Sequence, residues 1–510
     1  MMLKKSFSQI AVLLLILATL AGCGSGNSTS PSTNAGNGSS AETTAKPAEA
    51  PYTVYFAYHA PKEGNQAEVE EAISQLTMKD LNMKVKLIPI GFDTYMSKFP
   101  AMLAAKEPMD ISFVFTFVSA ASFLDAGYIV DASKYSDYTK DIVKVLGEDA
   151  NVGYYGDFLA GFPVNNVRSA PSAIFVRKDI FEALGYKESD FNVTTDDMSS
   201  FNQITKMLAR IKEKYPDITP LNGHRIFGQN TITYVDTLTD GFGVLENYGQ
   251  SDKVTNWYES DQFKQFAMLT REWFTKGYTS KDIAVDQELG QAKMKAGNCA
   301  AFFASYTANQ LVAVKGMTGY DCVMIPVSQK MKSTTTANGV LNSVMYQSQN
   351  KEKAFKFLNW CYTNGDFNDY LNWGVPGKDW IVNKDGQADY PEGVTMQNVN
   401  YHADFGFIYP NQYLMHPWAG SPKDVWDQLR QFDSNAIVSK GYGFTYDSGN
   451  VANEVAQCGA VLSKYESDIS FGAVDPETGL AKLNKDLYDA GLKKIMDEKQ
   501  KQLDAWLAKK

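Results

Sequence analysis

Catalysis and metal binding require particular residue types at particular spacings, and this chain offers few of them. Its 510 residues include five Cys and four His. No Cys pair has C-x-x-C spacing and no His pair has helical spacing, which argues against a redox centre or a zinc site. Neither a Gly-x-Ser-x-Gly elbow nor a His-Glu-x-x-His sequence occurs. The sequence therefore favours binding over catalysis and predicts no metal or cofactor.

Aromatic residues, by contrast, are plentiful at 13% of the chain, with 28 Tyr and 8 Trp. Many must lie in the core, but their flat apolar faces also suit a ligand that needs stacking partners. Trp373 and Trp418 lie in loops rich in Gly and Pro, where aromatic side chains are more suggestive of function. Trp360 and Trp506 follow helical spacing and are expected in the core. We therefore expect Trp373 and Trp418 to contact a ligand.

The elements that would position such side chains alternate between strand and helix. Strand-like segments at 52–58, 83–90 and 110–115 are separated by helical stripes that include Val69 and Tyr95. This order predicts a sheet with crossover helices, whose ligand usually lies beyond the carboxyl ends of the strands. The residues at two of these strand ends are therefore candidate ligand-binding residues: Tyr58, His59, Thr116 and Phe117.

The rest of the body repeats this alternation. Short strands are expected at 297–303 and 321–326, a helix at 351–362, and a last helix over about 485–508. A capping box of Thr194 and Asp197 is expected to begin the helix that ends at Lys214.

Two acidic segments and the remaining cysteines have ordinary structural interpretations. Asp240 precedes Gly241 and could accept hydrogen bonds from ligand hydroxyls, although a turn role is more typical. Residues 383–386 (NKDG) lack the downstream Glu of a calcium loop and predict a turn. Apolar neighbours favour buried free thiols over disulfides at four positions: Cys299, Cys322, Cys361 and Cys458.

The N-terminus carries the features of an export signal. Lys4 and Lys5 precede an apolar run from Ile10 to Leu20, which is too short to span a bilayer comfortably. The sequence Leu-Ala-Gly-Cys at 20–23 resembles the lipobox of bacterial lipoproteins, in which the Cys is acylated and becomes the first mature residue. Residues 24–50 lack aromatic residues and predict a disordered tether with a root-mean-square span of roughly 30 Å.

Charge and hydropathy argue against two kinds of partner for the folded body, namely nucleic acid and a membrane that it spans. The formal net charge is −10, which makes nucleic acid an unfavourable partner. No segment after the signal is long and apolar enough to span a membrane. Membrane attachment is therefore expected through a lipid on Cys23.

Four segments occur in the order and spacing of a known family. They are residues 102–115 (MLAAKEPMDISFVF), 162–185 (FPVNNVRSAPSAIFVRKDIFEALG), 294–310 (MKAGNCAAFFASYTANQ) and 339–362 (GVLNSVMYQSQNKEKAFKFLNWCY). With the lipobox, they make the chain similar to the extracellular solute-binding proteins of bacterial ABC importers, especially the oligosaccharide-binding group that includes maltose-binding protein. The tail at 426–507 resembles a C-terminal domain of a Gram-positive subgroup.

The resemblance implies an α/β fold of the two-lobed, periplasmic-binding-protein type (type II), with a hinge between the lobes and extra C-terminal helices. The implied organisation is a signal peptide (1–22), a lipidated Cys with a linker (23–50), lobe 1 (51–165 plus 318–338), lobe 2 (166–317 plus 339–425) and a C-terminal segment that packs on the lobes (426–510).

The resemblance also implies site residues. Tyr306 matches the position of the family's cleft aromatic, with a core tyrosine as the alternative. Asn165 and Arg168 fall at the first crossover between lobes, where Arg168 could donate to ligand hydroxyls or form a hinge salt bridge. The expected role is a monomeric receptor outside a Gram-positive cell that delivers a carbohydrate, in particular an oligosaccharide, to an ABC permease. A lipid-anchored polysaccharide hydrolase and a ligand-presenting sensor subunit are the alternatives.

Overall fold

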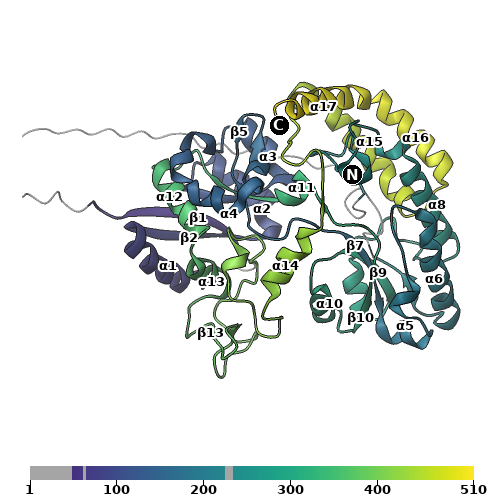
Figure 1. Cartoon of the computed structure of the whole chain (residues 1–510), viewed down its shortest axis with the longest axis horizontal. Coiled ribbons are helices and arrows are strands. Elements are labelled where there is room, and N and C mark those ends of the chain that lie inside the picture. Colours follow the sequence, from purple (N-terminus) through teal and green to yellow (C-terminus); the bar gives the residue numbers. More distant parts are fainter. Residues whose placement is uncertain (1–48, 61–64, 224–233) are drawn as a thin grey trace, which may run out of the picture. The chain divides into compact units, whose positions relative to one another are not determined.

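The computed structural model describes residues 49–60, 65–223 and 234–510. The predicted signal peptide, the lipidation site at Cys23 and nearly all of the predicted linker lie outside the described residues. Residues Ala50–Lys510 form one unit by their internal contacts, and Figure 1 shows its helices and strands.

The first sheet has five strands in the order β2-β1-β3-β12-β6. Its parallel part pairs β1 with β2 over eight residues and with β3, whereas β12 runs antiparallel to both β3 and β6. In β2 the buried residues alternate with exposed lysines, which places one face of this edge strand in the core. The strands are β1 (Tyr52–His59), β2 (Met83–Ile90), β3 (Ile111–Phe115), β6 (Phe162–Pro163) and β12 (Val340–Val344).

Helices cover this sheet because each offers it an apolar stripe. Val69 and Ile73 of α1 and Phe355, Phe357 and Leu358 of α12 are buried in one core cluster with β1. The helices that follow strands of this sheet are α1 (Gln66–Leu81), α2 (Phe92–Ala104), α3 (Thr116–Asp125), α4 (Lys140–Leu146), α12 (Lys351–Cys361) and α13 (Gly365–Trp373).

The second sheet has four strands in the order β10-β7-β9-β8. The centre of the sheet is β7, a continuous apolar run that pairs antiparallel with β9 and β10. Its strands are β7 (Ser172–Arg177), β8 (Thr219–Leu221), β9 (Cys299–Ser305) and β10 (Cys322–Pro326). The accompanying helices are α5 (Lys178–Ala183), α6 (Asn202–Lys214), α7 (Glu246–Gly249), α8 (Asp261–Thr275), α9 (Gly290–Lys295) and α10 (Gln310–Thr318). The short helix α11 (Thr334–Ala337) lies in the connection from β10 back to β12, and its Ala337 packs with Val152 and Tyr442.

The sheets contradict the predicted lobe boundaries after residue 317. β10 pairs with β7 in the second sheet, whereas β12 lies between β3 and β6 in the first. Tyr401 and Tyr409 are buried in the same core cluster as β1. Residues 322–326 therefore belong to the second lobe and residues 340–415 to the first, the reverse of the prediction, because an apolar strand carries no sign of which sheet it joins.

Three short strand pairs and α14 complete the connections. The chain passes between the lobes three times: between β6 and β7, between β10 and β12, and after residue 415. β11 (Met331–Lys332) lies in the second passage and pairs in parallel with β15 (Ile437–Val438) in the third. The other short elements are β4 (Tyr154–Tyr155), β5 (Phe158–Leu159), β13 (Ile381–Val382), β14 (Ala388–Asp389) and α14 (Val425–Ser434). The turn predicted at 383–386 is confirmed, since Gly386 N donates to Asn383 O at 3.0 Å between β13 and β14.

The C-terminal region contains three helices, α15 (Ala452–Ser470), α16 (Pro476–Asp489) and α17 (Leu492–Leu507). The single helix predicted over 485–508 is wrong, because Gly491 adopts φ 102° and separates α16 from α17. Leu483, Ile495 and Leu503 pack in one core cluster with Trp257 and Phe263 of the second lobe. The C-terminal helices therefore share a hydrophobic core with the second lobe.

Among the smaller sequence predictions, the structure contradicts the capping box and bears out the free cysteines. Asp197 caps a short 3₁₀ helix ahead of α6 by accepting from Ser199 N, so the predicted capping box with Thr194 is wrong. The four cysteines of the described residues are free and buried, as predicted. Burial raises the pKa of Cys299 to about 12 and so keeps its thiol protonated.

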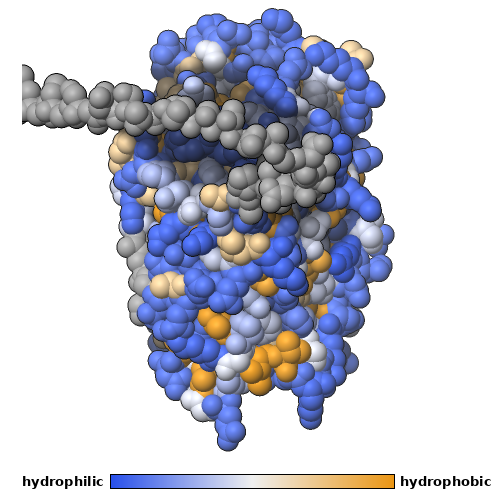
Figure 2. All heavy atoms as spheres, turned by 90° about the vertical axis from the view of Figure 1, so that its left-hand side faces the viewer, coloured by the Kyte–Doolittle hydropathy of each residue, from blue (hydrophilic) through white to orange (hydrophobic). Residues whose placement is uncertain are grey.

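The described surface is mostly polar. Hydrophilic residues cover most of the face shown in Figure 2, with smaller hydrophobic areas among them. Among residues 49–60, 65–223 and 234–510, no helix combines the length and the apolar composition needed to cross a bilayer.

Candidate functional site

Six aromatic rings form a connected group at one edge of the first sheet, which we call the aromatic platform. The His59 ring lies 4.4 Å from Phe405 and 6.4 Å from Phe92. Phe92 contacts Phe115 at 5.5 Å, and Phe115 contacts Phe117 at 5.4 Å. Phe405 lies 5.8 Å from the sixth ring. The platform consists of His59, Phe92, Phe115, Phe117, Phe405 and Phe407.

The platform has a buried base and an exposed surface. His59 and Phe115 are each only 3% exposed. Phe92, Phe117 and Phe407 are 62%, 69% and 51% exposed, respectively. Large aromatic side chains are seldom left this exposed together without a partner, so the three outer rings indicate a binding surface.

The parallel strands explain why three segments meet here. His59 ends β1, Phe92 begins α2 two residues after β2, and Phe117 lies two residues after the end of β3. The carboxyl ends of neighbouring parallel strands lie at the same edge of a sheet, which is where α/β proteins bind ligands. His59 Nδ1 lies 3.1 Å from Ile90 O and joins the first two of these ends.

A loop after α13 supplies the other two rings. Asp404 adopts the left-handed conformation with φ 55°, a conformation that Asp tolerates better than most residues. Phe405 N donates to Asn372 Oδ1 at 2.8 Å, and Ile408 N donates to Phe405 O at 2.8 Å. A Cβ on Gly406 would lie 2.7 Å from Met415 Cε, so the loop packs too closely there for a side chain. These contacts fix the backbone that presents Phe405 and Phe407.

The chemistry of such a surface is stacking rather than bond cleavage. Exposed ring faces bind the flat C–H faces of a ligand, and neighbouring polar groups would orient its hydroxyls. Among the described residues, no group of three or more His, Cys, Asp or Glu is arranged to hold a metal ion.

The strand-end prediction placed three residues at or beside the platform and misplaced one. His59 and Phe117 belong to it, and Thr116 begins α3 with its N donating to Gly339 O at 3.2 Å. Tyr58, in contrast, is 2% exposed, and burial raises its pKa to about 12. Its side chain points into the core because side chains alternate along a strand, so the prediction that Tyr58 contacts a ligand is wrong in this structure.

The two loop tryptophans lie in a separate aromatic cluster. Trp373 is 3% exposed and donates from Nε1 to His416 O at 3.2 Å. Its ring lies 4.7 Å from Trp418 and 5.1 Å from His402. Trp373 is therefore a core residue, contrary to the prediction, and the half-buried Trp418 packs against it rather than joining the platform.

Tyr306 follows β9 in the second sheet and is 8% exposed. Its ring meets Phe432 of α14 edge-on at 5.5 Å, and its N donates to Pro171 O at 2.9 Å. Burial raises the pKa of its hydroxyl. The structure therefore favours the core alternative for Tyr306.

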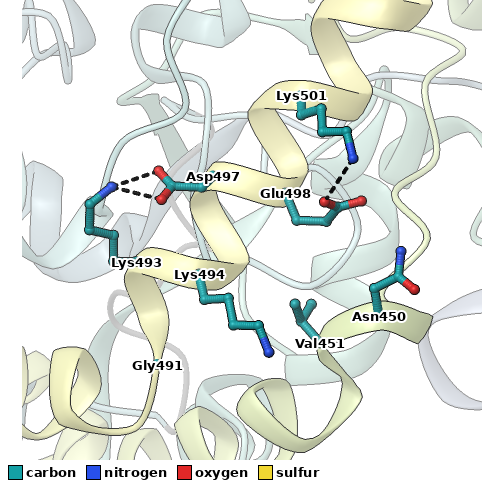
Figure 3. Close-up of a pocket in the computed structure, with 8 residues that line it drawn as sticks. All are labelled: Asn450, Val451, Gly491, Lys493, Lys494, Asp497, Glu498 and Lys501. Atoms are coloured by element: carbon teal, nitrogen blue, oxygen red, sulfur yellow. Dashed lines mark hydrogen bonds and ion pairs between the residues drawn. The ribbon is translucent and has the colours of Figure 1, made fainter.

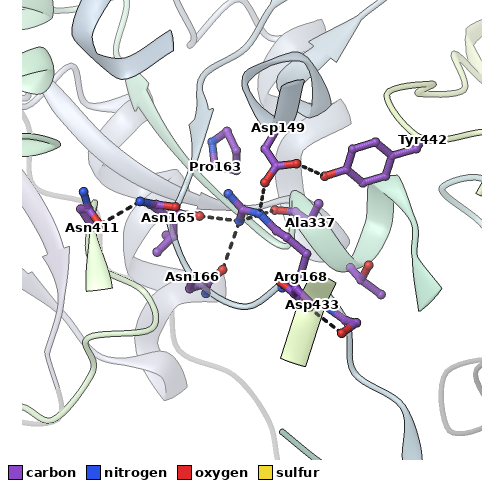
Figure 4. A network of polar contacts seen from close by, with 12 residues as sticks. Asp149, Pro163, Asn165, Asn166, Arg168, Ala337, Asn411, Asp433 and Tyr442 are labelled. Carbon is purple, nitrogen blue, oxygen red and sulfur yellow. Dashed lines mark hydrogen bonds and ion pairs between the residues drawn. The ribbon is translucent and has the colours of Figure 1, made fainter. Parts of the chain in front are cut away.

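Arg168 and Asn165 join the crossovers between the lobes (Figure 4). Arg168 is 2% exposed, and its Nε donates to Asp149 Oδ2 at 2.8 Å. Asn165 Nδ2 donates to Asn411 Oδ1 at 3.0 Å. Arg168 thus adopts the predicted hinge alternative and is buried too deeply to meet a ligand here.

Asp240 has a structural role, because it holds the C-terminal helix α17. It forms a salt bridge with Lys499 of α17, whose side chain is fully buried, and accepts from Phe242 N at 2.9 Å. The prediction that it accepts from a ligand is therefore wrong, and the turn alternative holds.

A cavity of about 580 Å³ lies beside α17, away from the platform residues (Figure 3). Its lysines are paired: Lys493 with Asp497 at 2.7 Å, and Lys501 with Glu498 at 3.5 Å. Lys494 pairs with Glu454 at 2.6 Å. With these charges neutralised, the cavity offers no built anion site.

Sequence reasoning named only His59 and Phe117 and missed four of the six platform rings, including Phe115, which ends a predicted strand. Phe92 follows a predicted strand by the same rule that identified His59, so that signal was available. Phe405 and Phe407 lie in a loop with no periodicity, and only the fold brings them to residues more than 300 positions earlier.

Two family models match the chain. The model described as bacterial extracellular solute-binding protein matches residues 60–366, and a domain of unknown function (DUF3502) matches residues 440–508. A relative from Streptococcus pneumoniae serotype 4, named carbohydrate ABC transporter substrate-binding protein, is 25% identical over 531 residues, covering 99% of each chain.

Solved structures share the fold. The N-glycan transport solute-binding protein NgtS of Streptococcus pneumoniae superposes with a TM-score of 0.76 at 19% identity, covering 90% of this chain and 99% of NgtS. Its complex with Man1GlcNAc gives 0.70 at 19% identity, covering 89% and 99%. An HMO-binding, ABC-transporter-associated solute-binding protein from Bifidobacterium longum infantis gives 0.62 at 17% identity, covering 90% and 99%.

These structures support a two-lobed solute-binding fold with added C-terminal helices. The first family model covers every strand of both sheets except β1, and more than half of the chain. The chain therefore belongs to the bacterial extracellular solute-binding proteins.

Proposed function

We propose that this protein captures an oligosaccharide on the aromatic platform and delivers it to an ABC importer. The observation that carries the proposal is the set of three exposed rings, Phe92, Phe117 and Phe407, on a buried aromatic base at the carboxyl ends of parallel strands. Sugar rings have apolar C–H faces that stack on aromatic side chains. The relative named a carbohydrate substrate-binding protein and the complex of NgtS with Man1GlcNAc support a sugar as ligand.

The proposed protein acts without breaking a bond in its ligand. It closes by hinge motion when the ligand bridges both lobes, because the ligand binds the closed state more tightly. A lipid on Cys23 holds it at the outer face of the cell membrane, where it works as a monomer beside the permease.

The first test is calorimetry of the mature protein with a panel of mono- and oligosaccharides. Phe117→Ala removes an exposed stacking face and is expected to weaken binding about tenfold, a loss of about 1.4 kcal/mol that is typical of one aromatic contact. The folded state should be unaffected because Phe117 is 69% exposed.

Tyr346→Ala is the matched control. Tyr346 is 66% exposed, but it follows β12, whose Val344 pairs with Ile111 at the amino end of β3. It therefore lies at the opposite edge of the sheet from Phe117, and its removal should leave affinity unchanged. Equal losses in both variants would contradict the platform as the binding site.

Chromatography of the same mixtures separates binding from catalysis. An intact ligand after long incubation is expected, and release of a shorter sugar would support the hydrolase instead. Binding of a peptide with no binding of any sugar would overturn the carbohydrate assignment.

A further inference from the structure

One side chain joins the hinge between the lobes to the aromatic platform. We propose that Asn166 is a positioning residue that couples ligand bound at the platform to closure of the hinge. This inference rests on the proposed function, because it requires that a ligand bind the platform.

Asn166 uses both ends of its amide group. Its Oδ1 accepts from Arg168 Nη1 at 3.1 Å, and its Nδ2 donates to Phe407 O at 2.9 Å. Phe407 lies 241 positions away in the chain and carries an exposed platform ring. A guanidinium has only donors and a carbonyl only accepts, so a single side chain can join them only if it offers one acceptor and one donor, as an amide does.

The Arg168 end of this link contacts all three passages of the chain between the lobes (Figure 4). Arg168 Nη1 donates to Ala337 O at 3.3 Å in the second passage, and Arg168 N donates to Asp433 Oδ2 at 2.6 Å in the third. Asp149, which accepts from Arg168 Nε, also accepts from Tyr442 Oη. A rotation of one lobe against the other must change some of these contacts, because the side chain that makes them is buried and fixed.

The other end of the link, Phe407, belongs to the platform. Its ring is available to a ligand, while its carbonyl is held by Asn166. A ligand that moves or steadies this ring therefore acts on the hydrogen bond to Asn166, and through it on Arg168. Coupling of this kind needs contacts that differ between the open and closed states, and the proposal places that difference in this short chain of contacts.

Asn166→Asp isolates the link. An aspartate keeps an oxygen for Arg168 but cannot donate to Phe407 O, so the hinge contact survives while the tie to the platform is lost. The measurement is sugar dissociation by stopped flow, together with closure by small-angle X-ray scattering with and without the sugar that the wild-type protein binds. We expect an unfolding temperature close to wild type, a dissociation rate about fivefold faster, and incomplete closure at saturating sugar.

Asn165→Ala is the matched control. Asn165 also ties the first passage to the same loop, but its side chain donates to Asn411 Oδ1 rather than to Phe407, and its backbone bonds to Pro410 and Gln412. It should change dissociation and closure less than Asn166→Asp does. Rescue in Asn166→Gln, a longer amide with both groups, would separate the link from simple loss of packing.

The possible outcomes distinguish a failure of the proposed coupling from a failure of the proposed sugar-binding function. A wild-type protein that binds none of the sugars overturns both proposals. Sugar binding by the wild type, with dissociation and closure unaltered in Asn166→Asp, overturns the coupling alone. Equal defects in Asn166→Asp and Asn165→Ala would show that both residues only support the loop, and would overturn it as well.

Discussion

At the scale of single residues, buried polar groups decide how the parts of the chain are fixed. Lys499 of α17 is fully buried, bonds to Asp240 and donates to Gly243 O at 3.0 Å. Burial lowers its pKa, and Asp240 opposes that shift. A buried cation whose partner is removed is strongly destabilising, so this pair specifies where α17 docks on the second lobe.

His402 makes the protein sensitive to acid. Burial among aromatic rings lowers its pKa from 6.5 to about 4. The unfolded state therefore binds a proton at higher pH than the folded state does, and stability falls as the pH drops from about 6.5 towards 4. His402→Gln should remove about 2 kcal/mol of the stability difference between pH 7 and pH 5, measured by urea unfolding at both values.

His416 is a control because its pKa is shifted in the opposite direction to that of His402. Its hydrogen bond to Asp369 raises its pKa, so the stability it adds is present below its unfolded pKa and is lost as the pH rises through its folded pKa. His416→Gln should therefore cost more at pH 5 than at pH 7. The same pH dependence in both variants would contradict the assignment of the acid sensitivity to His402.

At the scale of elements, periodicity predicted strands and helices better than it predicted their partners. The strand expected at 83–90 is β2 over the same residues, and the helix expected at 351–362 is α12. The sheet membership of β10 and β12 could not be predicted, since their apolar runs fit either sheet. Of the platform, only His59 and Phe117 were predicted from strand ends, whereas Phe405 and Phe407 depend on long-range packing.

The break between α16 and α17 tests how a single backbone conformation sets an element boundary. Gly491 has φ 102°, and a Cβ there would lie 2.6 Å from Glu454 Cγ. Gly491→Ala should lower the free energy of unfolding by about 1–2 kcal/mol, because L residues are strained at this φ and the Glu454 side chain must move. Thermal and urea unfolding measure the change.

Gly459→Ala is the matched control in the same region. Gly459 lies inside α15, and nothing lies within 4 Å of the position that its Cβ would occupy. Alanine favours a helix interior, so this change should raise stability by about 0.5–1 kcal/mol. Stabilisation by both substitutions would show that α16 and α17 can join into the single helix that the sequence suggested.

At the scale of the whole molecule, capture and delivery are assigned to different parts of the chain. The platform and the hinge lie within the unit Ala50–Lys510. The proposed lipid on Cys23 and the Gly- and Ser-rich residues 24–50 concern only where that unit works. Cys23→Ala should therefore release the protein from the membrane fraction to the medium, with sugar affinity unchanged by calorimetry.

Shortening the linker while keeping Cys23 tests how far the receptor can reach from the membrane without changing its attachment to the membrane. The proposed tether, expected to span roughly 30 Å, would set the effective concentration of the receptor at its permease. Deletion of residues 26–45 with Cys23 retained should keep the protein in the membrane fraction and keep its affinity, while uptake of labelled sugar falls because the closed receptor reaches fewer permeases. Release of the Cys23→Ala protein with undiminished uptake would contradict the tether, since a freely diffusing receptor would then serve the importer equally well.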